Sequence, residues 1–191
     1  MHIGLFFGSF NPVHIGHLAL ANYMLSFTDI DEVWLVVSPH NPLKNKNQLL
    51  DQNHRLHLVN LAIDDAPGIR SSNVEFNLPQ PSYTINTLVH LEEKYPQHRF
   101  SLIMGQDNLQ NFSKWKNYLE ILNGYHLYVY PRPDAKASEF DNHPQVHLTQ
   151  APLMEISSTF IRNAIKEKKD VRFFLPQKVW EQIDALGFYS S

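Results

Sequence analysis

Hydrophobic positions along the chain alternate between short apolar runs and longer segments with helical spacing. Continuous apolar runs such as EVWLVVS are typical of strands that are covered on both faces of a sheet. Strands are predicted from this pattern at 2–7, 32–38, 69–76, 99–105, 125–130 and 146–149. The Pro-bearing, polar segment 38–48 between two of the apolar stretches predicts a loop.

Helices are predicted in the segments between these runs. Residues 15–27 are nearly all apolar, which indicates a buried helix. Asp51 is a suitable N-cap for a helix that carries Leu56, Val59 and Ile63 on one face. Further helices are predicted at 83–94, 158–168 and 176–186.

This alternation predicts an α/β fold, a Rossmann-like, doubly wound parallel sheet with helices on both faces. We expect one domain, 1–191, whose C-terminal part is helical over about 157–187. Sheets of this kind bind ligands beyond the carboxyl ends of their strands. Polar segments that follow predicted strands, and so meet at this edge, are 8–17, 38–44, 105–107 and 157–162.

Composition narrows the classes of function. The chain has 191 residues, of which 43% are hydrophobic and 18% charged, as in a globular protein. Its net charge of −3 argues against a nucleic-acid partner, so an anionic ligand needs a local cluster of donors. The absence of cysteine excludes disulfides and thiolate metal ligands. Neither a signal peptide nor a membrane-spanning run is evident, which predicts a cytoplasmic protein.

The segment GSFNPVHIGHL, residues 8–18, carries the first candidate chemistry. His14 and His17 are three positions apart at the predicted start of a helix near Val13 or His14, on one face. The helix N-terminus adds unpaired N–H groups and the positive end of the dipole, which together bind anions. Gly16 removes a side chain where a large group approaches. A triphosphate fits this arrangement.

Other interpretations of the histidine pair stay open. Two histidines at this spacing can bind zinc, but a further protein ligand is then needed. Both could also be ordinary surface residues. The segment is neither a Walker loop nor a dinucleotide fingerprint. The letters HIGH also resemble class I aminoacyl-tRNA synthetases, but the chain is too short for such an enzyme and lacks a KMSKS-like loop.

The segment ISSTFIR, residues 156–162, is the second candidate. Ser157, Ser158 and Thr159 precede a helical run, which is a capping signature. Arg162 shares a helix face with Ser158 and Thr159, and a guanidinium group suits phosphate because it donates two parallel hydrogen bonds. The alternative is a plain N-cap followed by a surface arginine.

Together, G-x-F-x-P-x-H-x-G-H and S-S-T-x-I-R resemble the motifs of HxGH nucleotidylyltransferases. Within them, SPHNPLK, PSYTINTL, LIMGQDN, the Trp-Lys at 115–116 and VRFFLP are similar to bacterial nicotinate-nucleotide adenylyltransferases. The resemblance runs from His2 to about Ile183. It implies adenylyl transfer from ATP to nicotinate mononucleotide in NAD biosynthesis. The products are nicotinate adenine dinucleotide (deamido-NAD) and pyrophosphate.

The resemblance also implies roles for individual residues. The catalytic set is His14, His17, Arg162 and Lys44. The residues implied to bind ATP are Gly8, Ser9, Phe10, Gly16, Gly105, Asp107, Ser158 and Thr159. Those implied for the mononucleotide are Lys44, Thr84 and Trp115, with Trp115 stacking on the nicotinate ring. Mg²⁺ is expected through the substrate phosphates, without protein ligands.

Two positions depart from the usual family pattern. Asn11 and Asn86 stand where these enzymes usually have Asp, which leaves any role of a carboxylate there in doubt. The alternative activities are those of nicotinamide-mononucleotide and phosphopantetheine adenylyltransferases. A non-catalytic nucleotide-binding sensor is the alternative of another class.

Overall fold

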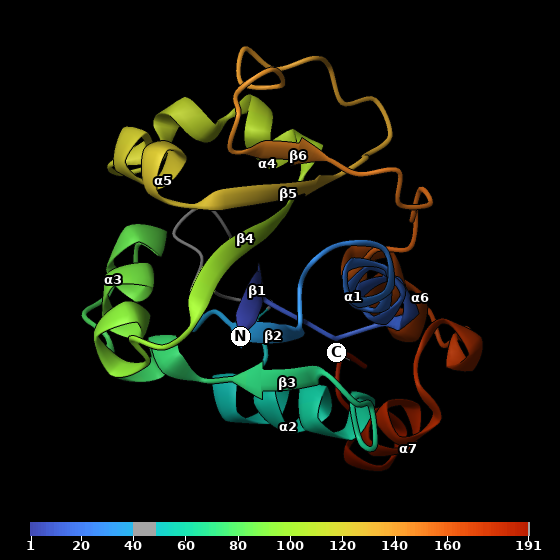
Figure 1. Cartoon of the computed structure of the whole chain (residues 1–191). Coiled ribbons are helices and arrows are strands. Elements are labelled where there is room, and N and C mark those ends of the chain that lie inside the picture. Colours follow the sequence, from blue (N-terminus) through green and yellow to red (C-terminus); the bar gives the residue numbers. More distant parts are fainter. Residues whose placement is uncertain (40–48, 191) are drawn as a thin grey trace.

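The computed structural model describes residues 1–39 and 49–190. The described residues form a parallel sheet of six strands in the order β3-β2-β1-β4-β5-β6 (Figure 1). The strands are β1 (His2–Gly8), β2 (Glu32–Val37), β3 (Ile69–Ser72), β4 (Arg99–Gly105), β5 (His126–Tyr130) and β6 (Val146–Leu148). The chain starts in the middle of the sheet and winds outward in both directions, so the predicted doubly wound fold is confirmed.

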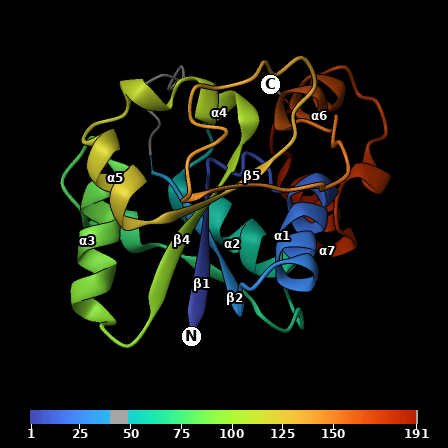
Figure 2. The ribbon, with the colours of Figure 1, turned by 45° about the horizontal axis from the view of Figure 1, so that its top comes forward.

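Helices cover both faces of the sheet, as the hydrophobic pattern predicts (Figure 1). One face packs against α1 (Ile15–Phe27), α2 (Gln52–Ala62), α6 (Ser158–Lys166) and α7 (Gln177–Leu186). The other packs against α3 (Thr84–Lys94), α4 (Gln106–Gln110) and α5 (Tyr118–Gly124). Short 3-10 helices are η2 (Val74–Asn77), η3 (Phe112–Lys114) and η4 (Arg172–Phe174). Figure 2 shows the chain's N-terminus at one end of the sheet and α4 and α6 near the opposite end.

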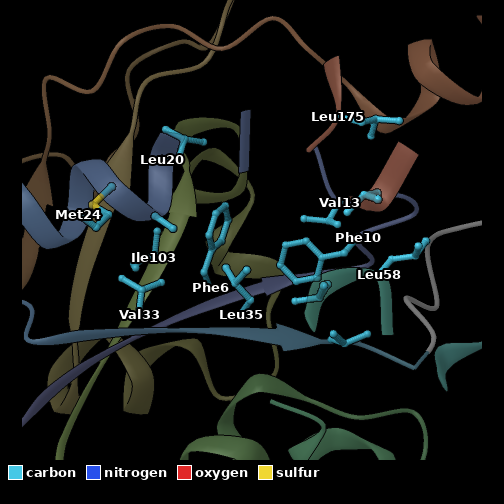
Figure 3. Packing of buried hydrophobic residues seen from close by; sticks show 14 of the residues in the cluster. Phe6, Phe10, Val13, Leu20, Met24, Val33, Leu35, Leu58, Ile103 and Leu175 are labelled. Atoms are coloured by element: carbon cyan, nitrogen blue, oxygen red, sulfur yellow. The ribbon is translucent and has the colours of Figure 1, made fainter. Parts of the chain in front are cut away.

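Apolar side chains hold the loop that follows β1 against the core. Phe10 is 2% exposed although its φ of 45° lies in the left-handed region. Its ring meets that of Phe6 edge to face at 6.0 Å, and Val13 is fully buried nearby (Figure 3). Burying one such side chain contributes about 1.5–3 kcal/mol, which offsets the unusual backbone conformation. The loop between β1 and α1 is therefore a packed part of the structure.

Two predicted elements differ from the structure. The predicted strand 69–76 is wrong beyond Ser72, because the chain turns into η2 and directs the carboxyl group of Glu75 inward to Thr87. The helix 15–27 is confirmed, but it is not buried all round. It buries Gly16, Leu20, Ala21 and Met24, whereas Phe27 is 71% exposed.

A buried arginine joins the loops that follow β1 and β2. Arg55 of α2 is fully buried, and its Nε donates to the carbonyl oxygen of Leu50 at 2.8 Å. Its Nη1 donates to the carbonyl oxygens of Ser9 at 2.6 Å and Ser38 at 2.8 Å. Its Nη2 donates to that of Pro39 at 2.9 Å. One guanidinium group thus fixes the backbone that follows two neighbouring strands at the carboxyl edge of the sheet.

Replacing this guanidinium group tests its structural importance. Arg55→Lys should lower the free energy of unfolding by about 2–4 kcal/mol, because buried carbonyl groups lose their donors and an ammonium cannot span them. Arg70→Lys is a matched control, since Arg70 is 64% exposed and pairs with Glu32 at 2.8 Å. It should cost less than about 1 kcal/mol. Equal losses in urea unfolding of the two variants would contradict this account.

Candidate active site

The paired histidines lie where β1 passes into α1. His14 is the N-cap of α1, with an extended backbone, and His17 lies in the first turn. The helix therefore starts just after His14, at Ile15. The two rings stack with centroids 3.7 Å apart and planes 30° apart. The backbone N–H of His14 donates to Nδ1 of His17 at 3.2 Å, so the pair also stabilises the helix start.

Close packing against neighbouring residues supports the rings of both His14 and His17. A Cβ atom on Gly16 would lie 3.1 Å from two atoms of the His14 ring, so that ring rests on glycine backbone. The His17 ring meets the buried ring of Phe10 at 5.0 Å and 70°. A Cβ atom on Gly8 would lie 2.8 Å from Phe10, so glycine is needed there for packing. Packing fixes the orientation of the histidine pair before any ligand binds.

His14 is an unusual histidine because it is buried and its surroundings destabilise the protonated, positively charged form. It is 5% exposed, and its Nδ1 has no hydrogen-bond partner among the described residues. Burial, together with the positive charge of Arg132, lowers its pKa to about 4. The ring is therefore neutral at neutral pH in the ligand-free protein.

The second motif docks directly onto the first. Nη1 of Arg162 donates to the carbonyl oxygen of Asn11 at 2.8 Å, and the Ser158 hydroxyl donates to that of Pro12 at 2.9 Å. Nη2 of Arg162 also reaches the Thr159 hydroxyl at 3.4 Å. The N-terminus of α6 and the N-terminus of α1 thus meet at one edge of the sheet, as the two motifs predict.

These contacts define what α6 can offer a ligand. Ser157 is the N-cap of α6, and its hydroxyl accepts a hydrogen bond from the N–H of Phe160 at 3.2 Å. The hydroxyl of Ser158, assigned to ATP by resemblance, is used for docking in this structure. The remaining donors are backbone N–H groups, the Thr159 hydroxyl and the unused N–H groups of Arg162.

The side chain of Asn11 faces the protein and is 5% exposed. Its Oδ1 accepts hydrogen bonds from the backbone N–H of Leu50 at 3.2 Å and from the hydroxyl of Tyr189 at 2.9 Å. The amide thus links the loop after β1 to the C-terminal segment. Tyr189 carries no sequence signal of this role, because the contact joins distant parts of the chain. Asn86, the other departure, is an exposed residue of α3.

The carboxyl ends of β4 and β5 contribute a third group of residues to the site. Gly105 ends β4 and is the N-cap of α4, where a Cβ atom would meet the Asp107 carboxylate and lie 3.1 Å from Arg132. Nε of Arg132 lies 3.6 Å from Oδ1 of Asp107, and the guanidinium group lies over the Tyr130 ring at 5.5 Å. Sequence reasoning missed Arg132. The available signal was a cation just beyond a strand, at the carboxyl edge.

Thr84 and Trp115, two of the three residues implied for the mononucleotide, lie on the face covered by α3 and α5. Thr84 is the first residue of α3, and Nζ of Lys116 lies 4.5 Å above the ring of the preceding Tyr83. The neighbouring Trp115 is half-buried and packs on Phe112 at 5.3 Å. These contacts bring the segments around Thr84 and Trp115 together. Lys44 and most of the predicted loop 38–48 lie outside the described residues.

The described residues contain no group of three metal-ligating side chains that could hold a metal ion. At the carboxyl edge, the carboxylate of Asp107 is already paired with Arg132. This donor set does not fit a protein-bound Mg²⁺, which prefers several oxygen ligands in octahedral geometry.

Among the helices of the described ranges, none is long and apolar enough to cross a membrane.

Comparison with known proteins gives the class and then the family. The cytidylyltransferase-like family matches residues 5–164, so the fold and its paired motifs define a member of this class. Relatives named probable nicotinate-nucleotide adenylyltransferase include that of Flavobacterium psychrophilum, 56% identical over 99% of both chains. That of Cytophaga hutchinsonii is 51% identical over the whole of both chains. The chain belongs to the nicotinate-nucleotide adenylyltransferase family.

Solved structures agree on the fold. The nicotinic acid mononucleotide adenylyltransferase of Plasmodium falciparum, complexed with NaAD, superposes with a TM-score of 0.80 and covers 98% of this chain and 97% of its own. The same protein complexed with APC gives a TM-score of 0.79. At 17% sequence identity, this likeness shows the shared fold alone.

The buried, neutral state of His14 predicts a pH-dependent stability. As the pH falls below 6.5, the unfolded chain takes up a proton at this histidine, whereas the folded protein does not until about pH 4. The free energy of unfolding should therefore decrease between these pH values, by at most ~3 kcal/mol from this group. His14→Asn should flatten the decrease in urea unfolding measured from pH 7.5 to 4.5.

A matched control is available on α2. His57 is an exposed residue of that helix, and His57→Asn should keep the wild-type dependence. If His14→Asn loses stability with pH as steeply as the wild type, the buried neutral imidazole is not present.

Proposed function

We propose that the protein catalyses adenylyl transfer from ATP to nicotinate mononucleotide, giving deamido-NAD and pyrophosphate for NAD biosynthesis. The observation that carries the proposal is the docking of α6, with Arg162, against the loop that ends in His14 and His17. This contact joins two anion-binding helix ends with a guanidinium group and two imidazoles. We further infer a cytoplasmic enzyme, since its donor is ATP.

The chemistry needs positioning and positive charge more than proton transfer. A phosphate oxygen of the mononucleotide, already ionised at neutral pH, attacks the α-phosphorus of ATP in line. The new P–O bond forms as the bond between the α-phosphorus and the bridging oxygen breaks, and pyrophosphate leaves with that oxygen. Developing negative charge is stabilised by donors already fixed at the site. These are His14, His17, Arg162, Arg132 and the N–H groups that begin α1 and α6.

His14 supplies a proton-dependent part of this field. Its pKa of about 4 reflects burial and Arg132, without any phosphate nearby. A triphosphate beside the ring would raise that pKa, because a nearby negative charge favours the imidazolium form. ATP binding and protonation of His14 are therefore coupled, because bound ATP increases the fraction of His14 that carries a proton.

The mononucleotide occupies the side of the edge formed by α3 and the Trp115 segment. The start of α3 offers backbone N–H groups to the nicotinate carboxylate, and the indole of Trp115 offers a face to the ring. Donors arranged for a carboxylate reject the neutral amide, because they are left unpaired. This arrangement supports the acid over nicotinamide mononucleotide. Lys44 completes the proposed mononucleotide-binding set, whereas Asp107 belongs to the proposed ATP-binding set.

Mg²⁺ enters this proposal as an ion carried by the substrate phosphates. Held by phosphate oxygens and water, it would neutralise part of the polyphosphate charge. The described protein residues contribute no carboxylate cage for the ion.

Pyrophosphate release tests the proposed function. With ATP and Mg²⁺, the protein should release pyrophosphate with nicotinate mononucleotide and at least ~10²-fold more slowly, as kcat/KM, with nicotinamide mononucleotide. Phosphopantetheine should give none, and EDTA should abolish the release. Preference for the amide or phosphopantetheine would identify a sister enzyme. ATP binding without pyrophosphate release from any acceptor would indicate the nucleotide-binding sensor.

Removing one imidazole tests the catalytic assignment. His17→Ala should lower kcat by ~10²-fold or more, on the scale of losing one fixed donor to the transition state. Exposed His57 on α2 serves as the control, since His57→Ala should turn over like the wild type. A His17→Ala enzyme with near-normal kcat would remove the imidazole from the mechanism.

A further inference from the structure

A buried carboxyl group lies beside the mononucleotide side of the site, and the mechanism above does not use it. Glu75, in η2, is 3% exposed. The hydroxyl of Thr87, itself fully buried, donates to its Oε1 at 2.9 Å. The hydroxyls of Ser38 and Ser82 also lie near this carboxyl group and favour its charged form. Burial raises the pKa of Glu75, and these hydroxyl groups partly offset the rise.

The partners of Glu75 come from segments that surround the start of α3. Ser38 follows β2, Ser82 precedes the N-cap residue Tyr83, and Thr87 lies in the first turn of α3. In addition, Nε2 of Gln80 donates to the carbonyl oxygen of Glu75 at 3.1 Å. Glu75 therefore connects the segment after β2 with the residues before and within the first turn of α3.

This arrangement leaves the N-terminus of α3 without a side-chain cap. Tyr83 makes no capping hydrogen bond, and the first turn contains no acidic residue. The nearby Ser82 hydroxyl interacts with the carboxyl group of Glu75 and favours its charged form. The first N–H groups of a helix lack intrahelical partners and favour an anion. The start of α3 is thus kept open.

Burial of a carboxyl group has a cost in stability that an apolar side chain would avoid. An apolar residue could fill the space under α3, but it could not hold two or more hydroxyl groups in a single arrangement. The cost of burying the Glu75 carboxyl group is offset if function depends on the position of the α3 N-terminus.

We propose that Glu75 is a positioning residue for the acidic mononucleotide. Its carboxyl group holds Ser82 and Thr87 in place, so that the start of α3 meets the nicotinate carboxylate. The inference rests on the proposed function, because it places that carboxylate at α3. Glu75 itself does not touch the reacting atoms. The proposed ATP-binding residues of α1 and α6 lie on the opposite face of the sheet, so the effect should fall mainly on mononucleotide binding.

Steady-state kinetics of Glu75→Gln test the proposal. The variant keeps the shape of the side chain but exchanges one acceptor oxygen for a donor. The KM for nicotinate mononucleotide should rise ~10-fold, as expected when positioning is lost at a distance from the chemistry. The KM for ATP and kcat should stay within about twofold, and discrimination against nicotinamide mononucleotide should fall. Destabilisation alone would reduce the amount of active enzyme, without changing KM or discrimination.

Thr87 provides a second, independent pair of variants. Thr87→Val removes the hydroxyl at nearly constant volume and should raise the same KM, whereas Thr87→Ser keeps the hydroxyl and should restore it. Glu92→Gln is the matched control. Glu92 lies in the last turns of the same helix and accepts a hydrogen bond from the Tyr125 hydroxyl at 2.8 Å. That variant should leave both KM values unchanged.

The outcomes separate this inference from the function on which it rests. Wild-type turnover with an unchanged mononucleotide KM in Glu75→Gln and Thr87→Val would overturn the role of Glu75 alone. Equal changes in the KM for ATP and for the mononucleotide would also overturn it, since they indicate general disturbance. A wild-type protein that releases no pyrophosphate with nicotinate mononucleotide would overturn both.

Discussion

The account depends on the contact between the N-terminus of α6 and the backbone of the loop that follows β1. Arg162 and Ser158 donate to consecutive carbonyl oxygens, those of Asn11 and Pro12. These hydrogen bonds join segments at opposite ends of the chain and set two helix N-termini beside each other. Since each terminus attracts anions, their convergence produces a site for a polyanion that neither segment could form alone. The paired imidazoles and the Arg162 guanidinium group are thereby brought to the same edge of the sheet.

The rest of the molecule holds this contact in place. Phe10 anchors the loop in the core, and Arg55 fixes its backbone from below through the carbonyl oxygen of Ser9. Because these supports are buried, the site is preorganised without bound nucleotide. Preorganised donors stabilise developing charge without having to rearrange during the reaction. The same burial favours the neutral form of His14, so the site carries less unbalanced positive charge when it is empty.

Local pattern was enough to predict the fold. Continuous apolar runs and helical spacing identify the alternating elements, and alternation leaves few topologies for a parallel sheet. The same approach failed at 73–76, where a strand-like alternation of residues ends in η2. There the backbone N–H of Phe76 donates to the carbonyl oxygen of Asn73 at 2.9 Å instead of to a neighbouring strand. In the site, the histidine pair and Arg162 are visible because each lies in a short motif. Arg55, Arg132 and Tyr189 are not, since their roles depend on contacts between residues far apart in sequence.

The central claim can be tested most directly by following the His14 ring during nucleotide binding. In protein labelled with ¹⁵N-histidine, the ring should titrate near pH 4 without ligand. Bound ATP should raise its pKa by at least about one unit, because phosphate charge comes next to the imidazole. In Arg162→Gln, saturating ATP should raise it less, since the chain of phosphates is no longer held from the α6 side. An unchanged His14 pKa in wild-type protein saturated with ATP would contradict the account.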